Sequence, residues 1–373
     1  MKVDWLIVGA GFSGATLAER LATQLDQRVL VVEKRNHIGG NAFDEHNEAG
    51  ILVHRYGPHI FHTNSRKVWD YLSQFTDWRP YRHRVLGVID GRKVPIPFNL
   101  TSLHTLFPAQ EARRLETELL ESYGYGHKVP ILKLREQANG PLRSLADFIY
   151  EKVFYGYTLK QWDLPPEELD SAVTGRVPVH ISRDDCYFQD RYQAMPLRGY
   201  HQLFLNMLEH PNIELLLDSD YRDVLNTVTF KRMVYTGPID AFFDYRYGEL
   251  PYRSLRFEER TLEQEYFQEV GTINYPNSHE FTRITEQKHL TGQRSSRTTL
   301  MTEYPEAHVT GENEPYYPVP REENRERYQR YLEEAGKLKT KVFFSGRLAD
   351  YRYYNMDQAI AAALALFDKL SHV

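Results

Sequence analysis

Three glycines near the start of the chain have the spacing of a backbone turn that binds phosphate. Gly9, Gly11 and Gly14 lie in the stretch GAGFSG, between the apolar run 5–8 and a segment with apolar residues at helical spacing. In such turns the first glycine permits the tight turn, the second lets backbone approach a pyrophosphate, and the third lets helix and strand pack closely. The N-terminus of the helix faces the negative charge. The stretch therefore predicts a dinucleotide site.

A carboxylate follows at the separation that a ribose requires. The apolar run 28–33 ends in Glu33, 19 residues after Gly14. A carboxylate there accepts a hydrogen bond from a ribose 2′-hydroxyl and repels a 2′-phosphate. Gly39 and Gly40 provide a second place where backbone can approach a ligand closely. The pattern predicts an adenine dinucleotide. An N-terminal fingerprint followed by Glu-x5-Gly-Gly resembles the FAD proteins built like glutathione reductase, so FAD is favoured over NAD.

Composition and charge exclude several classes of protein. With 373 residues the chain is expected to form two or three domains, and its formal net charge of −5 excludes nucleic-acid binding through bulk positive charge. A single cysteine, Cys186, excludes a disulfide framework and a multi-cysteine metal site, and favours a reducing compartment. No signal peptide is expected, and the apolar run 359–367 is too short for a bilayer. We expect a soluble, cytoplasmic protein.

Tyrosine is the residue type that stands out, with 26 copies against 4 tryptophans. A tyrosine offers a stacking face and a hydroxyl group, which suit a sugar or nucleotide ligand. Most of these residues are nevertheless expected to decorate sheets.

The elements that must position these residues can be outlined from periodicity and turn signals. Residues 51–99 are expected to form strands and turns, with Asp90-Gly91 as a type I′ hairpin turn, and helical patterns dominate residues 102–157. Residues 163–176 form a proline-punctuated connection suited to a mobile lid. Later segments predict a helix at 198–211, a strand at 212–219, a strand-rich stretch at 224–245, antiparallel strands at 252–263, 270–277 and 282–290, a helix at 321–335, a strand at 341–346 and a final helix.

The predicted fold class is α/β, with a Rossmann-like FAD-binding domain, a helical insert domain and an antiparallel β-sheet domain. The discontinuous FAD-binding domain is expected to comprise residues 1–80, 190–238 and 321–373. Residues 100–162 are assigned to the helical domain, with lid and dimer contacts. The antiparallel sheet, as the substrate domain, takes residues 81–99, 163–189 and 239–320.

Nine stretches in the same order along the chain resemble the bacterial type of the UDP-galactopyranose mutase family. They are YGPHIFHT (56–63), GRKVPIPFNL (91–100), YGYTLKQW (155–162), GRVPV (175–179), DYRYGELPYRSLRF (244–257), FTRITEQKHL (281–290), TEYP (302–305), PYYPVP (315–320) and GRLADYRYYNMDQAI (346–360). The resemblance implies a flavin-dependent isomerase that interconverts UDP-galactopyranose and UDP-galactofuranose without net redox change. N5 of reduced FAD would attack the anomeric carbon, UDP would leave, and the flavin-iminium adduct would ring-open and reclose.

The resemblance also implies which residues hold the substrate. Arginine suits a diphosphate because its planar fork meets phosphate oxygens in pairs. Arg176 and Arg283 match the family's two essential diphosphate arginines, and Arg253 lies at the site edge. The other implied substrate-binding residues are Tyr157, Trp162, Tyr187, Asn274, Tyr317 and Tyr353. The sequence does not decide between Tyr316 and Tyr317, because neighbours on a strand face opposite ways.

Histidines and the C-terminal stretch complete the implied cofactor site. His54, His59 and His62 lack an acidic or cysteine partner at metal-ligand spacing, so no metal is predicted. The resemblance assigns His62 to the isoalloxazine edge as a catalytic candidate. The implied FAD-binding residues are Gly9, Gly11, Phe12, Ser13, Gly14, Glu33, Lys34, Gly39, Gly40, Asn41, His59, Ile60, Gly346, Arg347, Tyr353, Met356 and Asp357. His180 departs from the family pattern, in which arginine is common, and a structural role is favoured for it.

The implied partners are UDP-galactose in its pyranose and furanose forms, an external reductant such as NADH or NADPH, and further copies of the chain in a homo-oligomer. No nucleic acid and no membrane partner is expected. Two other functions remain open. An FAD oxidoreductase such as an amine oxidase or desaturase would share the N-terminal fingerprint but would not need two buried arginines for a dianion. A non-catalytic nucleotide-sugar sensor would bind UDP-galactose without isomerising it.

Overall fold

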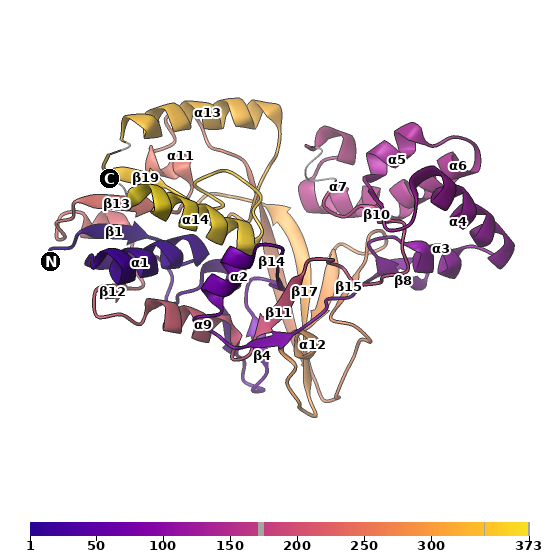
Figure 1. The fold of residues 1–373 in the computed structure, drawn as a ribbon, viewed down its shortest axis with the longest axis horizontal. Helices are drawn as coiled ribbons and strands as arrows, with labels where there is room; N and C mark the ends of the chain where they lie inside the picture. The colour runs from indigo at the N-terminus through magenta and orange to yellow at the C-terminus, as the bar shows by residue number, and fades with distance from the viewer. Residues whose placement is uncertain (171–174, 339, 372–373) are drawn as a thin grey trace. The chain divides into compact units, whose positions relative to one another are not determined.

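A computed structural model describes residues 1–170, 175–338 and 340–371 of the chain (Figure 1). The chain divides into two compact units. Unit 1 comprises Met1–Tyr81, Asp190–Tyr252 and Glu322–Val373, and unit 2 comprises Arg82–Gln189 and Arg253–Arg321. Residues 171–174, in the expected lid connection, lie outside the described residues. The three-domain division expected from the sequence remains a prediction.

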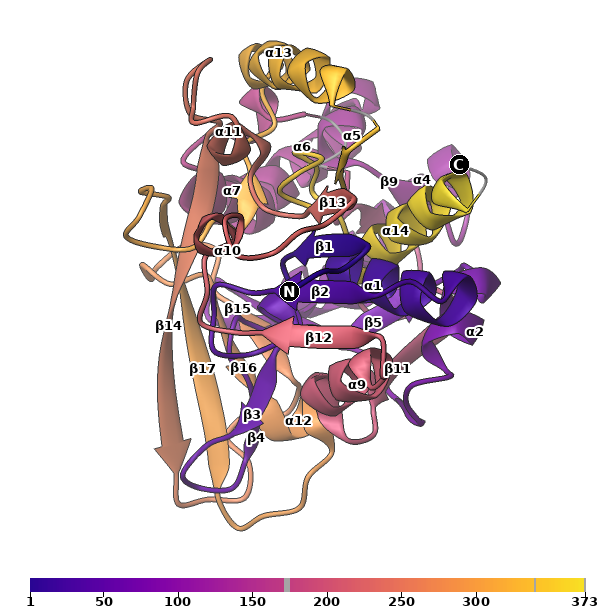
Figure 2. The ribbon, with the colours of Figure 1, turned by 90° about the vertical axis from the view of Figure 1, so that its left-hand side faces the viewer.

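Unit 1 is built around a five-stranded parallel sheet. Its strand order is β12 (Ile213–Leu216), β2 (Val29–Val32), β1 (Trp5–Val8), β13 (Arg232–Tyr235) and β19 (Val342–Phe344). Figure 2 shows β1, β2 and β12 side by side. Since side chains alternate along a strand, Leu6, Leu30 and Val32 share one face, where they pack with Tyr221 and Val224 of α10 (Tyr221–Val224). The predicted Rossmann-like sheet is therefore present, and its strands run from both ends and the middle of the chain.

Further helices and small sheets complete unit 1. α1 (Phe12–Leu25) packs against α14 (Met356–Leu370), so the last helix of the chain lies beside the first. The remaining elements are the helices α2 (Arg66–Leu72), α9 (Gly199–Leu208), α11 (Ile239–Phe242) and α13 (Glu322–Lys337), the short η1 (Gly40–Ala42), the sheet of β5 (Phe61–Thr63), β11 (Tyr192–Pro196) and β6 (Trp78–Pro80), and the pair β3 (Asp44–His46) and β4 (Leu52–His54).

Unit 2 combines a seven-stranded sheet with a helical bundle. The strand order is β18 (Tyr317–Pro318), β14 (Tyr252–Leu262), β17 (Thr298–Ala307), β16 (Arg283–Glu286), β15 (Thr272–Asn274), β7 (Val85–Ile89) and β8 (Arg92–Ile96). Apolar side chains of β7 and β8 share a buried core with the helices. The other elements are α3 (Leu100–Leu106), α4 (Ala109–Tyr123), β9 (Lys128–Val129), α5 (Ile131–Gln137), α6 (Gly140–Ile149), the π-helical η2 (Tyr150–Tyr155), α7 (Gly156–Trp162), η3 (Pro166–Glu168), β10 (Val179–His180) and α12 (Gln287–Thr291).

Several local predictions are confirmed and others are wrong. The hairpin turn is confirmed, since Asp90 and Gly91 have φ of 47° and 77° between β7 and β8. Four short helices of the described residues were missed: α2 lies within residues expected to form strands, α10 follows the strand expected at 212–219, α11 lies in the supposedly strand-rich stretch, and α12 replaces the end of an expected strand. α11 has four residues, too few to show a helical period, whereas Val68, Tyr71 and Leu72 of α2 do have helical spacing and were overlooked. Among the described residues no helix is long and apolar enough to span a bilayer.

Candidate functional site

The glycine turn of unit 1 has the backbone geometry that the sequence predicts. Gly9 has φ of 98°, a conformation that L side chains rarely adopt, and its amide donates to the Val32 carbonyl over 2.8 Å. A Cβ on Gly14 would lie 1.9 Å from the Gly9 carbonyl oxygen. Gly11 is the N-cap residue of α1, which begins at Phe12. The turn therefore lets α1 lie directly against the end of β1.

Glycines distant in sequence lie against this turn. Gly39 has φ of 98° and donates its amide to the Ala10 carbonyl over 2.9 Å. A Cβ on Gly40 would lie 3.0 Å from the Gly11 Cα, and a Cβ on Gly346 would lie 2.9 Å from the Ser13 hydroxyl. Side chains at Gly40 and Gly346 would therefore crowd the atoms of the turn. The three segments form one backbone cradle at the N-terminus of α1.

Glu33 stands at the end of β2, next to the turn. Its side chain is buried, with Oε2 accepting from the Ala10 amide over 2.9 Å and Oε1 from the Arg35 amide over 3.1 Å. A carboxylate has about four lone-pair sites. The two amides fix the orientation of Glu33 and leave it further capacity to accept hydrogen bonds from a ribose.

The N-terminus of α14 meets strand β5. Asp357 Oδ2 accepts from the Thr63 hydroxyl over 2.8 Å, whereas Oδ1 is buried and has no hydrogen-bond partner among the described residues. Asn355 caps the helix through a capping box with Gln358. A buried carboxylate oxygen left without a donor fits a ligand hydroxyl, such as one on a ribityl chain.

His62, the middle residue of β5, forms a hydrogen-bonded pair with Asp190. Its Nδ1 lies 2.9 Å from Asp190 Oδ2, and Asp190 Oδ1 accepts from the Asn64 amide group over 2.7 Å. A proton on Nδ1 makes Nε2 the acceptor of the neutral ring. His59 is fixed separately, because its amide donates to His54 Nδ1 over 3.0 Å. In the part of the chain that the structure describes, no three metal-ligating side chains converge.

The other expected cofactor residues of unit 1 differ in burial and in their contacts. Phe12 is buried and packs its ring on Phe204 at 4.6 Å, so its contribution to a ligand is confined to its backbone. Asn41 accepts from Arg35 Nη2 over 3.0 Å. Arg347 lies in a turn in which its carbonyl accepts from the Arg352 amide, and Tyr353 is half-buried. Ile60 is buried and Lys34 is exposed.

In unit 2, three polar residues form one row across the sheet. Asn274 and Arg283 were expected from the sequence, and Glu303 was not. Asn274 is the register partner of Arg283, and Arg283 is in turn the partner of Glu303. Directly opposed residues of neighbouring strands present their side chains on the same face. The ends of β15 and β16 therefore bring an amide and a guanidinium together, with a carboxylate behind them on β17.

Arg283 is held by Glu303 through two contacts to one oxygen. Its Nε and Nη2 lie 2.9 and 2.8 Å from Glu303 Oε2, and the two side chains are 24% and 2% exposed. Burial opposes the charge of Arg283, but the Glu303 carboxylate and the phenols of Tyr157 and Tyr317 outweigh burial and raise its pKa well above the usual value. Arg283 is therefore a fixed cation whose orientation Glu303 sets.

Two phenols interact electrostatically with the Arg283 guanidinium. They belong to Tyr157, which lies on α7, and to Tyr317, which lies on β18. Trp162, the last residue of α7, is 6% exposed and packs on Tyr317 with ring centroids 5.9 Å apart. Tyr316 is instead buried at 4% exposure and packs on Phe257. This geometry favours Tyr317 over Tyr316 as the tyrosine that could meet a ligand at Arg283.

Arg253 holds the C-terminal end of α7. Its Nε donates to the Gln161 carbonyl over 3.0 Å, and its Nη2 donates to the Lys160 carbonyl over 3.3 Å. A cation at this end of a helix satisfies carbonyls that have no partner within the helix. Arg253 thus positions the helix that carries Tyr157 and Trp162.

Two expected substrate residues have other surroundings. Arg176 is exposed, in the turn that follows residues 171–174. Tyr187 donates its amide to the His83 carbonyl over 2.8 Å and packs against Phe188 and the helical core. His180 is buried in the β9–β10 pair, where burial and then the charge of Lys128 lower its pKa. A neutral, buried His180 agrees with the structural role favoured from the sequence.

Sequence reasoning missed Glu303 and Lys160, although both lie in the quoted stretches TEYP and YGYTLKQW. Glu303 continues the phase of Thr299 and Met301, which are buried on the inward face of β17. A charged residue in the inward phase of a strand was the available signal, since such a charge needs a partner. Lys160 carries no comparable signal, because its partners lie 115 to 121 residues further along the chain.

The fold and the glycine cradle define a dinucleotide-binding protein of Rossmann type. A family model described as an NAD(P)-binding Rossmann-like domain matches residues 7–75. A second model, described as UDP-galactopyranose mutase, matches residues 152–353. A probable UDP-galactopyranose mutase of Klebsiella pneumoniae is 36% identical over 98% of this chain and 94% of its own length. The chain belongs to the UDP-galactopyranose mutase family.

Other similar proteins bear on the fold and on specificity. A dTDP-fucopyranose mutase of Escherichia coli is 34% identical, with 96% of each chain covered. The crystal structure of a reduced UDP-galactopyranose mutase has a TM-score of 0.77 at 17% identity, with 100% of this chain and 94% of that chain covered. A putrescine oxidase bound to putrescine has a TM-score of 0.61 at 13% identity, with both chains fully covered. The last two show the fold alone.

Proposed function

We propose that the chain is a flavin-dependent isomerase that interconverts UDP-galactopyranose and UDP-galactofuranose. The observation that carries the proposal is the row of Asn274, Arg283 and Glu303, with the phenols of Tyr157 and Tyr317 close to the Arg283 guanidinium. A fixed cation among neutral donors and aromatic rings suits a uridine diphosphate. The membership of the chain in a family of mutases supports this substrate class.

The residues of unit 1 fit FAD. The glycines at 11, 40 and 346 keep side chains out of the cradle, Glu33 suits the ribose, and Asp357 Oδ1 suits a ligand hydroxyl. When bound and reduced, the flavin would supply the electron pair that displaces UDP from the anomeric carbon, and the pair would return to the flavin once the sugar ring has reclosed and UDP has bonded again. NADH or NADPH from solution would reduce it. We also expect a homo-oligomer.

The chain's own residues would hold the diphosphate while its bond to the sugar breaks and reforms. Arg283 would bind phosphate oxygens through the parts of its guanidinium that Glu303 does not engage, and its fixed charge would stabilise the charge that develops on leaving UDP. Because Glu303 neutralises much of that charge, a second cation is required, and Arg176 is proposed for this role. Tyr317 would donate to a phosphate oxygen, and Asn274 to the diphosphate or the sugar.

The remaining residues would complete the two sites. Tyr157, Trp162 and Tyr187 would contact the uridine, and Arg253 would hold the edge of its site. His62 would lie at the isoalloxazine edge, with its tautomer set by Asp190. Tyr353 would reach a substrate phosphate, and Arg347 would lie near the flavin.

A second candidate differs in the nucleotide sugar. The Escherichia coli relative named dTDP-fucopyranose mutase is nearly as similar as the Klebsiella relative, at 34% against 36% identity. dTDP-fucose carries a methyl group on the base, lacks the ribose 2′-hydroxyl and lacks the sugar 6-hydroxyl. Both substrates present the same diphosphate to Arg283, so the cluster around that residue suits either.

One assay separates these candidates and the oxidoreductase alternative. The purified chain is reduced with dithionite, incubated in turn with UDP-galactofuranose and with the furanose form of dTDP-fucose, and the products are separated by chromatography. We expect conversion of UDP-galactofuranose to the pyranose form, only under reduction. Conversion of the dTDP sugar alone would select the second candidate. Bound flavin without any isomerisation would overturn both.

A variant tests the role of the cluster. Arg283→Lys keeps the charge but loses the planar fork, so we expect turnover to fall by at least about 100-fold while the flavin spectrum is unchanged. Arg256→Lys, at an exposed arginine of β14, is the matched control and should leave turnover unchanged. Loss of flavin from Arg283→Lys would mean that this residue belongs to the cofactor site instead.

A further inference from the structure

Lys160 makes an unusual set of contacts with a single loop. Its ammonium donates to the carbonyls of Tyr275, His279 and Phe281, with Nζ 2.9 Å from the His279 oxygen and 3.0 Å from the Phe281 oxygen. A lysine has three N–H donors, so three carbonyls use all of them. Burial lowers its pKa to about 8, and at neutral pH the amine still carries its proton.

The loop is organised to receive this ammonium. The rings of Tyr275, His279 and Phe281, the same residues that supply the carbonyls, pack on one another with centroids 4.7 to 5.1 Å apart. Residues 275–281 follow Asn274, the last residue of β15, and lead to β16, which begins at Arg283. The loop therefore joins the two strands that carry the candidate diphosphate residues.

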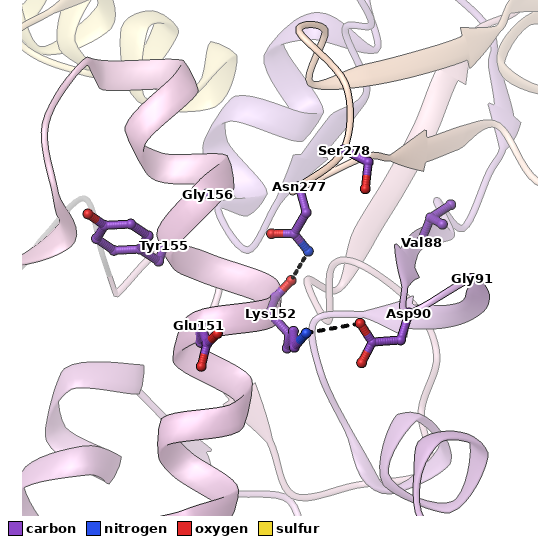
Figure 3. Close-up of a pocket in the computed structure, with 9 residues that line it drawn as sticks. All are labelled: Val88, Asp90, Gly91, Glu151, Lys152, Tyr155, Gly156, Asn277 and Ser278. Carbon is purple, nitrogen blue, oxygen red and sulfur yellow. Dashed lines mark hydrogen bonds and ion pairs between the residues drawn. The ribbon is translucent and has the colours of Figure 1, made fainter.

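Two further contacts press the start of α7 and the preceding η2 against the same loop. A Cβ on Gly156 would lie 2.6 Å from the Pro276 carbonyl oxygen, so only glycine allows this approach. Asn277 donates its side-chain amide to the Lys152 carbonyl over 2.9 Å, as Figure 3 shows. Beside the contact is a cavity of about 430 Å³, where the Lys152 ammonium pairs with Asp90 at the rim.

We propose that Lys160 is a positioning residue that locks α7 to the 275–281 loop and thereby holds Tyr157 against Arg283 for binding of a nucleotide diphosphate. Tyr157 precedes Lys160 by three residues, so their side chains are neighbours on the helix surface. The inference rests on the proposed function and names no contact of Lys160 with the substrate.

The test measures UDP binding to the flavin-loaded chain by titration calorimetry. Lys160→Met keeps the length of the side chain and removes all three donors, so we expect the Kd for UDP to rise about tenfold or more. Lys152→Met, eight residues earlier, removes an ammonium paired with exposed Asp90 and should change the Kd less than twofold. Lys160→Arg keeps the charge and should recover part of the affinity. A Kd unchanged in Lys160→Met would overturn the proposal.

A double-mutant cycle separates positioning from general loosening. If Lys160 acts through Tyr157, Lys160→Met should have little further effect in a Tyr157→Phe background. Independent, additive effects would overturn the proposal. If Lys160→Met does not fold, Lys160→Gln and Lys160→Arg take its place in the cycle.

A measurement without substrate distinguishes this inference from the proposed function. Amide hydrogen exchange of residues 275–281 and α7 should accelerate in Lys160→Met and not in Lys152→Met. A wild-type chain that binds neither UDP nor dTDP would overturn the proposed function whatever the exchange shows. Unchanged exchange in Lys160→Met would overturn the inference even if UDP binds.

Discussion

The glycine cradle of unit 1 and the Arg283 cluster of unit 2 differ in what builds them. In the cradle, backbone atoms lie so close to Gly14 and Gly40 that side chains have no room there. In the cluster, charged side chains take their orientation from partners on other elements, as Arg283 does from Glu303. One site is made of main-chain turns and the other of hydrogen-bonded side chains.

This difference decides which changes each region tolerates. A backbone cradle is sensitive to added volume, because neighbouring main-chain atoms cannot rotate away. A side-chain cluster is sensitive to removal of a partner, because the group left behind stays buried without compensation. A substitution that adds volume should therefore disturb the cradle most, and one that removes a charged or hydrogen-bonding partner should disturb the cluster most.

The largest effect is expected from Gly14→Ala in the cradle. Its Cβ would lie 1.9 Å from the Gly9 carbonyl oxygen, so α1 would have to shift away from β1. We expect the unfolding free energy to fall by about 3 kcal/mol and bound flavin to be lost. Chemical denaturation and the flavin absorption spectrum measure these two outcomes.

Gly336→Ala is the matched control, since Gly336 also lies inside a helix, α13, but a Cβ there would meet nothing within 4 Å. Alanine has the higher helix propensity, so stability should rise by about 0.5–1 kcal/mol. Equal destabilisation by the two variants would refute close backbone packing as the cause.

An intermediate effect is expected from Glu303→Gln in the cluster. The change leaves Arg283 charged and largely buried without its counter-ion. Because 24% of the Arg283 side chain is exposed, we expect a loss of about 2 kcal/mol, less than for a fully buried pair. Thermal unfolding measures the loss, and the flavin spectrum should not change.

The control for this variant is Glu258→Gln, which breaks the exposed pair with Arg256 on the neighbouring strand β14. Surface pairs contribute little to stability, so no change in the melting temperature is expected. If Glu303→Gln were as harmless as this control, the cluster would not depend on side-chain partners.

The smallest effect concerns a carboxylate in unit 1, where the backbone otherwise predominates. Asp44 accepts from the Tyr200 and His201 amides over 2.7 Å at the start of α9, and burial raises its pKa to about 6. Between pH 4 and pH 6 the native state therefore binds more protons than the unfolded chain, so stability is lost as pH rises through this window. In Asp44→Asn the loss should be absent, a difference of about 1 kcal/mol over the single unit from pH 5 to pH 6.

Unfolding in urea at several pH values between 4 and 7 tests this sign. Asp70→Asn, at an exposed residue of α2, serves as the control and should keep the wild-type pH dependence. A wild-type pH dependence in Asp44→Asn would show that the buried carboxylate does not titrate in this range.

The features that the sequence predicted well are local. The turn from Gly9 to Gly14 and the Asp90-Gly91 hairpin each depend on φ values and on contacts within a few residues. The missed helix α12 has five residues, and Leu290 is its one apolar residue, so it shows no helical period. Leu290 is fully buried, a contact that only the tertiary structure shows.

The candidate sites were predicted unevenly for the same reason. Tyr351 and Tyr354 had no assigned role in the sequence; the structure shows the Tyr351 hydroxyl donating to the Pro251 carbonyl over 2.6 Å, which is a structural contact. Arg283 was identified only through a family resemblance. Its counter-ion Glu303 was missed although a charged residue in the inward phase of β17 was a signal, whereas nothing in the flanking residues indicates the loop contacts of Lys160.

The sequence by itself determined the Rossmann-type turn and most of the longer elements, because glycine spacing and apolar periodicity act over a few residues, and its motifs resemble those of the family. Only the tertiary structure decided that Gly39 and Gly346 close the same cradle, that Tyr317 and not Tyr316 lies toward Arg283, and that Lys160 holds the 275–281 loop. The physical reason is that buried charges and close backbone contacts are satisfied by whichever segments the fold brings together, and those partners lie far away along the chain.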